Sequence, residues 1–308
     1  KRLKKSGQWF YLMCLSLLEE QGIKRLETRN KRQDGENSGL SRNGEAGSNI
    51  NVRIVDSVNV KEPGRTGSLW KVHYSLKLPS LDCDFFNLSE LKDKDSSFFP
   101  YPIRQDDLII ADNSAYIHDI ASKQGFVIVD VHPSKLNKLR IYTQERQAFL
   151  LLEQIQFLKK TGKIQSWDVL FYGHEQEHDP GPDPVKGRIC AIKKSETAIR
   201  AAHAALKAEI LEHGTVIEPE CYEFAKYIVV FTTFPKEKYS SFDVLECYRL
   251  CWQLRPVLKR FKDLFQIGHL PKYDDESSRA WFYGKFFVAL LMEKLQRYAD
   301  SVSPWGYV

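Results

Sequence analysis

The sequence predicts an α/β protein in which helices flank a mixed sheet, and three observations support this class. Residues 71–78 alternate polar and apolar side chains, which is typical of a half-buried antiparallel strand. Residues 108–111 form a continuous apolar run, which is typical of a strand buried on both faces. Residues 195–213 are rich in Ala, Lys and Glu and predict a helix.

Composition limits the classes of protein that remain. The chain has 308 residues, 43% of them hydrophobic, which suits one large domain or two small ones. No run of about 18 apolar residues occurs, so we expect no membrane-spanning helix. The net charge of +5 permits an anionic partner. Six cysteines are scattered without a CxxC pair, which predicts reduced thiols in a cytoplasmic protein.

The first half of the chain divides at its polar stretches. The basic residues 1–5 before an apolar run resemble a signal peptide, but no small-residue cleavage site follows, so we expect a packed helix over residues 7–20. Residues 27–50 are charged and rich in Gly, Asn and Ser, which predicts a flexible connector. A helix is expected around residues 115–124. The predicted strands are 52–56, 70–76, 83–88, 107–112 and 126–131.

The second half predicts a mostly β region with one helix. Its expected strands are 167–172, 187–192 and 227–232. Residues His174 to His178 fit the H-E-x-x-H pattern of zinc hydrolases, which requires both histidines on one face of a helix. Prolines follow almost at once and leave room for about one helical turn. We therefore expect a hairpin loop and no zinc, with a zinc hydrolase as the distant alternative.

Two aspartates stand at the ends of apolar runs. Asp56 follows residues 52–55, which are apolar except for Arg53, and Asp112 follows the apolar run 108–111. Carboxylates that project at a sheet edge suit divalent cations, and DNA strand cleavage uses two such ions about 3.5–4 Å apart. The alternative is that both residues cap turns after their strands.

A resemblance to a known family decides between these alternatives. Residues 247–262 read CYRLCWQLRPVLKRFK and resemble the signature helix of a DDE transposase of insertion-sequence family four. That family places Tyr, Arg, Glu and Lys here, with two, three and six residues between them. Tyr248 and Lys262 match the pattern. Cys251 stands at the position of the Arg, and Arg255 stands at the position of the catalytic Glu.

The resemblance covers roughly residues 50–290. It includes residues 53–74, residues 107–112 with the following Tyr116, and residues 270–285, although Asn-Ser-Ala stands before Tyr116 where the family has Arg-Gly or a small residue. It implies a ribonuclease-H-like mixed sheet with a mostly β insertion between the second Asp and the signature helix. The implied parts are an N-terminal helical segment that ends a truncated DNA-binding region (1–26), the connector (27–50), the first part of the core (51–135), the insertion (136–240), and the signature and C-terminal helices (241–308).

The resemblance also implies a chemistry. Asp56 and Asp112 are expected on adjacent central strands, close enough to share Mg²⁺ or Mn²⁺. Position 255 completes the catalytic set in the family. The implied partner is DNA at transposon ends, in a bacterial, nucleoid-associated setting and without a membrane. The residues implied in DNA binding are Tyr248, Cys251, Lys259, Arg260 and Lys262.

The two replaced positions predict impaired catalysis. A cation at Arg255 repels a metal: at about 4 Å and an effective dielectric near 20, a pair of unit charges is worth ~4 kcal/mol and a divalent ion about twice that. Cys251 removes a bidentate phosphate clamp, and Pro256 removes a backbone donor in the predicted helix interior. We expect a transposition protein, for metal-dependent DNA cleavage and strand transfer, that has become a pseudoenzyme. The alternative is a non-catalytic remnant that binds DNA or another transposase subunit.

Overall fold

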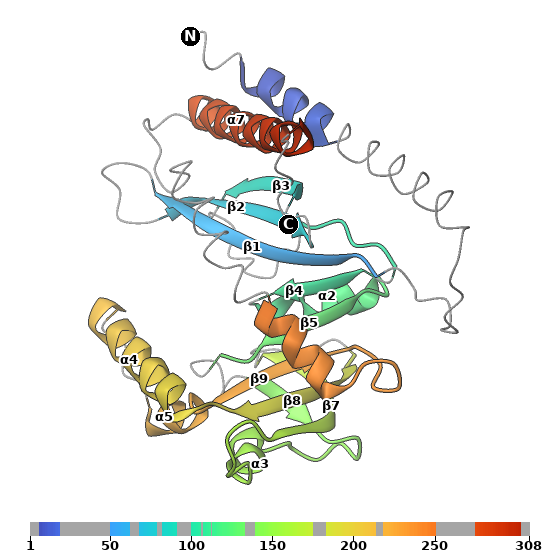
Figure 1. The fold of residues 1–308 in the computed structure, drawn as a ribbon, viewed down its shortest axis with the longest axis vertical. Coiled ribbons are helices and arrows are strands. Elements are labelled where there is room, and N and C mark those ends of the chain that lie inside the picture. The colour runs from blue at the N-terminus through green and yellow to red at the C-terminus, as the bar shows by residue number, and fades with distance from the viewer. Residues whose placement is uncertain are drawn as a thin grey trace. The chain divides into compact units, whose positions relative to one another are not determined.

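A computed structural model shows an α/β protein with a mixed sheet and flanking helices, as predicted (Figure 1). The chain forms two compact units: residues 1–50, 56–94 and 255–308 make the first unit, and residues 51–55 and 95–254 make the second. No helix in the described part of the chain is long and apolar enough to cross a membrane. The residues that the structure describes are 6–18, 50–61, 68–78, 82–90, 100–105, 107–111, 113–132, 139–174, 183–213, 218–250 and 275–302.

The strands of the first unit are in the order β3-β2-β1. β2 (Ser68–Lys77) and β3 (Cys83–Glu90) are antiparallel, as predicted, and β2 neighbours β1 (Val52–Lys61). The prediction that β2 is half-buried is wrong, because the polar residues His73 and Ser75 are as buried as the apolar residues next to them on the strand. His73 Nε2 lies 3.0 Å from Ser89 Oγ on β3, and such a hydrogen bond lets a polar side chain enter the core.

Two helices complete the first unit. The helix over residues 6–18 agrees with the prediction and lies beside α7 (Asp275–Val302), as the blue and red ribbons of Figure 1 show. The thiol of Cys14 donates to the carbonyl of Tyr283 on α7 at 3.4 Å. Phe286 of α7 stacks on Phe86 of β3, with the ring centroids 4.6 Å apart, so aromatic packing joins α7 to the strands.

The second unit has the strand order β1-β4-β5-β9-β8-β7-β6. β1, β4 and β5 are parallel, and the remaining neighbours are antiparallel. All four residues of β4 are buried, which confirms the prediction from the apolar run. The remaining strands are β4 (Leu108–Ala111), β5 (Phe126–Asp130), β6 (Leu139–Tyr142), β7 (Ile164–His174), β8 (Val185–Lys193) and β9 (Tyr227–Thr232).

Short helices connect the strands of the second unit. The predicted helices 115–124 and 195–213 are present as η1 (Ser114–Tyr116) with α2 (Ile117–Ser122), and as α4 (Glu196–His213). The sequence did not predict β6, α3 (Leu151–Gln156) or α5 (Pro219–Phe224). A further helix covers residues 241–250 and is drawn in orange in Figure 1. Residues 27–49 of the predicted connector lie outside the described residues.

Candidate functional site

The structure describes only part of the predicted site. Asp56 lies on β1, and Tyr248 lies on the helix over residues 241–250. The other predicted site residues lie outside the described residues: Asp112, Cys251, Arg255, Lys259, Arg260 and Lys262.

Asp56 lies within a strand, so the prediction that it ends one is wrong. β1 continues to Lys61, because backbone pairing does not stop where the apolar run stops at Val55. A turn-capping role for Asp56 is excluded for the same reason.

The Asp56 carboxylate is half-buried and oriented by two neutral donors. The hydroxyl of Tyr74 on β2 donates to Oδ2 at 2.7 Å, and the amide of Ser57 donates to Oδ1 at 2.7 Å. An ionised carboxylate offers about four lone pairs, so each of its oxygens can accept more than one bond. This oriented oxygen pair is a suitable ligand for a hard divalent cation.

The two strands that lead to the predicted aspartates are neighbours, as expected. β1 and β4 are parallel, and their last paired residues are Ile54 and Ile110. Asp56 and Asp112 each follow those residues by two positions in the sequence. Because Asp112 lies outside the described residues, the shared metal stays a prediction.

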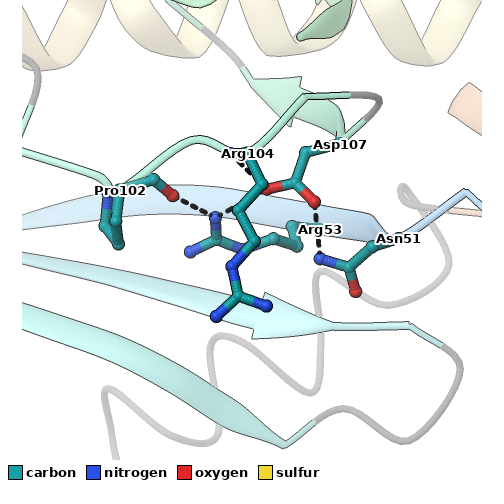
Figure 2. A network of polar contacts seen from close by, with 5 residues as sticks. All are labelled: Asn51, Arg53, Pro102, Arg104 and Asp107. Atoms are coloured by element: carbon teal, nitrogen blue, oxygen red, sulfur yellow. Dashed lines mark hydrogen bonds and ion pairs between the residues drawn. The ribbon is translucent and has the colours of Figure 1, made fainter. Parts of the chain in front are cut away.

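A buried ion pair fixes the other end of this strand pair (Figure 2). Arg53 Nη1 lies 3.4 Å from Asp107 Oδ2, and the two side chains are 4% and 3% exposed. The same guanidinium donates to the carbonyl of Pro102 at 2.5 Å. Asp107 also accepts from Asn51 Nδ2 at 2.9 Å and from the Arg104 amide at 3.0 Å. The network ties the start of β1 to the residue that precedes β4.

Sequence analysis missed this network. It counted Asp107 as the first residue of a strand, whereas β4 begins at Leu108. An acid directly before an apolar run and a cation inside a strand were the available signals. Arg53 and Asp107 are 54 positions apart in the chain, so only the tertiary structure shows that they are partners.

Tyr248 is 6% exposed. It shares a buried helix face with Val244 and Leu245, while Arg249 and Leu250 are exposed. The spacing of one and four residues is that of a helix face packed on a core. The Tyr248 ring is therefore mostly buried, and its contact with DNA stays a prediction.

Asp130 is an acid that sequence analysis did not single out. It ends β5, directly after Val129, which pairs with Ala111 of β4. Burial lowers the pKa of the neighbouring Lys194, and the charge of Asp130 opposes that shift. The ammonium of Lys194 donates to the carbonyl of Ala225 at 2.8 Å.

The zinc-hydrolase alternative requires His174 on a helix, and the structure places it on a strand. His174 is the last residue of β7, and residues 175–182 lie outside the described residues. β7 and β8 are antiparallel neighbours, which supports the predicted hairpin. Within the described ranges, no group of three or more His, Cys, Asp or Glu side chains could hold a metal ion.

The described cysteines are free, as predicted for reduced thiols. Among them, Cys14, Cys83, Cys190 and Cys221 are buried. Burial raises the pKa of the Cys14 thiol to about 12, so this group stays protonated and is a poor nucleophile near neutral pH.

Comparison with known proteins gives one consistent relationship. No protein-family model matches the chain. The chain is 23% identical over 300 residues to the transposase for insertion sequence element IS421 of Escherichia coli, which covers 96% of this chain and 74% of the relative. It has the same identity and coverage with InsL of Escherichia coli K12, provisionally named a transposase for insertion sequence element IS186A. This similarity, which extends over nearly the whole chain, supports a relationship to insertion-sequence transposases.

Proposed function

We propose that this chain is a transposase-family protein that acts on DNA at insertion-sequence ends and is impaired in catalysis. The observation that carries the proposal is the oriented carboxylate of Asp56 on β1, next to the parallel strand β4. The similarity to the IS421 and IS186A proteins supports the same function. The parallel strands β1, β4 and β5 and the antiparallel pair β2 and β3 are compatible with a ribonuclease-H-like core.

In this proposal Asp56 and Asp112 hold Mg²⁺ or Mn²⁺. When bound, the ion activates the attacking oxygen and stabilises the leaving oxygen of the DNA backbone. Tyr74 keeps Oδ2 of Asp56 in place, which is the usual contribution of a hydrogen-bond partner behind a metal ligand. Asp130 is the described acid that we would test first as a substitute for the family's Glu, because it ends the strand next to β4.

Impairment rests on Arg255 and Cys251. The first places a cation where the family has a metal ligand, and the second removes a bidentate phosphate contact. Phosphate binding by Lys259, Arg260 and Lys262 requires neither the family's Glu nor its Arg, so we expect DNA binding to survive. A remnant that binds DNA or another transposase subunit without cutting is the second candidate function.

A cleavage and strand-transfer assay tests the proposal. DNA carrying IS421-type ends is incubated with Mg²⁺ or Mn²⁺ and with wild type, Arg255→Glu, or the triple variant Cys251→Arg, Arg255→Glu, Pro256→Leu. We expect little cleavage by wild type, partial recovery in the single variant and more in the triple variant. Robust cleavage by wild type would disprove the impairment. Salt-sensitive DNA binding by all three proteins without cleavage would favour the remnant.

A Mn²⁺ titration tests the metal site separately. Wild type is compared with Asp56→Asn and Asp130→Asn, and Asp168→Asn serves as the control because it alters an exposed carboxylate on β7. We expect Asp56→Asn to weaken Mn²⁺ binding and the control to leave it unchanged. Equal binding by wild type and Asp56→Asn would remove Asp56 from the site. Weaker Mn²⁺ binding by Asp130→Asn would identify Asp130 as a further ligand.

A further inference from the structure

The helix over residues 241–250 has a closely fixed N-terminal end. The Ser240 hydroxyl accepts from the Asp243 amide at 3.2 Å. Asp243 Oδ2 accepts in return from the Ser240 amide at 2.8 Å and from its hydroxyl at 2.7 Å. This reciprocal pattern is a capping box, which satisfies backbone donors that a helix end otherwise leaves unpaired.

The segment before this helix is folded onto itself. The rings of Phe234 and Tyr239 stack with centroids 4.1 Å apart and planes inclined by 13°. The amides of Lys238 and Tyr239 both donate to the carbonyl of Pro235, at 3.3 and 3.1 Å. Phe234 is buried, so the turn is anchored in the core of the second unit.

Arg188 of β8 connects this turn to the sheet. It is only 4% exposed, and its Nη2 donates to the carbonyl of Tyr239 while Nη1 lies 3.5 Å from Ser241 Oγ. The guanidinium therefore contacts the chain on both sides of the capping residue Ser240. The preceding Gly187 is needed, because a Cβ there would lie 2.4 Å from Cζ of Phe231 on β9. Moving a guanidinium out of water costs free energy, and the hydrogen bonds of Arg188 offset part of that cost.

The helix that begins here leads directly to the predicted DNA-binding residues. Its residues Val244, Leu245 and Tyr248 are buried, and the chain then continues into the segment 251–262. A shift of the first turn would move Tyr248, which lies on the same helix.

We propose that Arg188 is a positioning residue that sets where this helix begins, and thereby where Tyr248, the described member of the predicted DNA-binding set, lies. The part about DNA rests on the proposed function, whereas the anchoring of the helix does not. Because Arg188 is buried, it positions the helix that carries Tyr248 without contacting phosphate itself.

Hydrogen exchange of the full chain tests the anchoring. Arg188→Met keeps an unbranched apolar stem and removes every donor, and Arg188→Lys keeps the charge with fewer donors. Lys236→Met is the matched control, since it removes a cation near Arg188 that binds the exposed side of Asp168. We expect Arg188→Met to raise exchange in residues 241–250 about tenfold, the factor for one lost buried hydrogen bond, with little change in β7, β8 and β9. The exchange rate of residues 241–250 in Arg188→Lys should lie between those of wild type and Arg188→Met. The rate in the control Lys236→Met should match that of wild type.

Binding to a short DNA duplex of mixed sequence provides the second measurement. We expect Arg188→Met to weaken binding about tenfold while the slope of log affinity against log salt stays unchanged, because no phosphate contact is lost. A residue that contacts phosphate would instead reduce that slope by about 1. Partial rescue of the affinity by Arg188→Lys would support positioning by a cationic hydrogen-bond donor at this site.

The outcomes separate this inference from the proposed function. Exchange that rises equally in the strands and the helix would overturn the inference, as would a reduced salt slope in Arg188→Met. If Arg188→Met does not fold, the same comparison is made with Arg188→Lys. If wild type fails to bind DNA, the proposed function fails, and the exchange experiment alone decides whether Arg188 anchors the helix.

Discussion

Asp107 and Asp56 are the same chemical group in two different surroundings along one strand pair. Asp107 is buried, and it receives hydrogen bonds from Asn51, the Arg104 amide and the guanidinium of Arg53. Asp56 is half-buried and accepts hydrogen bonds from the Tyr74 hydroxyl and the Ser57 amide. The first carboxylate lies in the core with a cation against it, whereas the second is oriented and partly exposed to solvent.

The difference shows what separates a structural acid from a candidate metal ligand. A buried charge is stable only when its partners are fixed, so Asp107 belongs to the framework that joins β1 to β4. An acid that binds a metal must be held in position yet remain open to a further partner. Asp56 meets the first condition through its two hydrogen bonds, and Mn²⁺ binding tests the second.

The largest effect is expected from Asp107→Asn. The amide removes the charge that compensates Arg53, and breaking such a buried pair costs about 3–5 kcal/mol. This is a large fraction of the stability of an ordinary domain. Urea unfolding would measure the loss, with Asp56→Asn as the matched carboxamide control. Similar losses in both variants would contradict the contrast between the two acids.

The second effect is a loss of stability in acid that comes from His73, next to Tyr74 on β2. Burial, aided by the charge of Lys71, lowers the pKa of His73 to about 4 from 6.5. The unfolded chain therefore binds a proton below pH 6.5 while the folded chain does not, so stability falls between pH 6.5 and 4. The full contribution is roughly 3 kcal/mol, at 1.36 kcal/mol for each pKa unit.

The comparison for His73 is wild type against His73→Gln, unfolded in urea at several pH values. The variant lacks the titrating ring, so its stability should fall less steeply over this pH range. Parallel pH profiles for the two proteins would show that His73 does not titrate as its burial predicts.

A smaller effect is expected from Tyr74→Phe. The variant loses the hydroxyl that donates to Asp56, and such a bond contributes about 1 kcal/mol, or somewhat more when the acceptor is charged. Removing the partner of a metal ligand typically costs 10–100-fold in metal affinity. We therefore expect a modest change in thermal unfolding together with clearly weaker Mn²⁺ binding. Unchanged Mn²⁺ affinity would mean that Tyr74 does not orient the ligand.

The smallest effect on stability is expected from Asp56→Asn. The carboxamide oxygen can still accept from the Ser57 amide, and its amino group can donate to the rotatable Tyr74 hydroxyl, so the free energy of unfolding should change by less than about 1 kcal/mol. Mn²⁺ binding should nevertheless be lost with the charge. A large destabilisation with intact Mn²⁺ binding would give Asp56 the same structural role as Asp107.

The sequence by itself determined the elements whose patterns are long or strongly apolar. The predicted strands 70–76, 107–112 and 227–232 correspond to β2, β4 and β9, and the predicted helix 195–213 corresponds to α4. β6, α3 and α5 have four to six residues each, too few for a helical or alternating period to be recognised.

Only the tertiary structure decided which strands are neighbours and which polar groups are partners. β9 comes last in sequence among the described strands, yet it lies between β5 and β8. Arg53 and Asp107 form one buried network, and Arg188 reaches the turn before the helix over residues 241–250. Such pairs depend on distances in space between residues about 50 positions apart, which a local pattern does not encode. Local periodicity therefore predicted the elements, and burial with hydrogen bonding decided the role of each charged side chain.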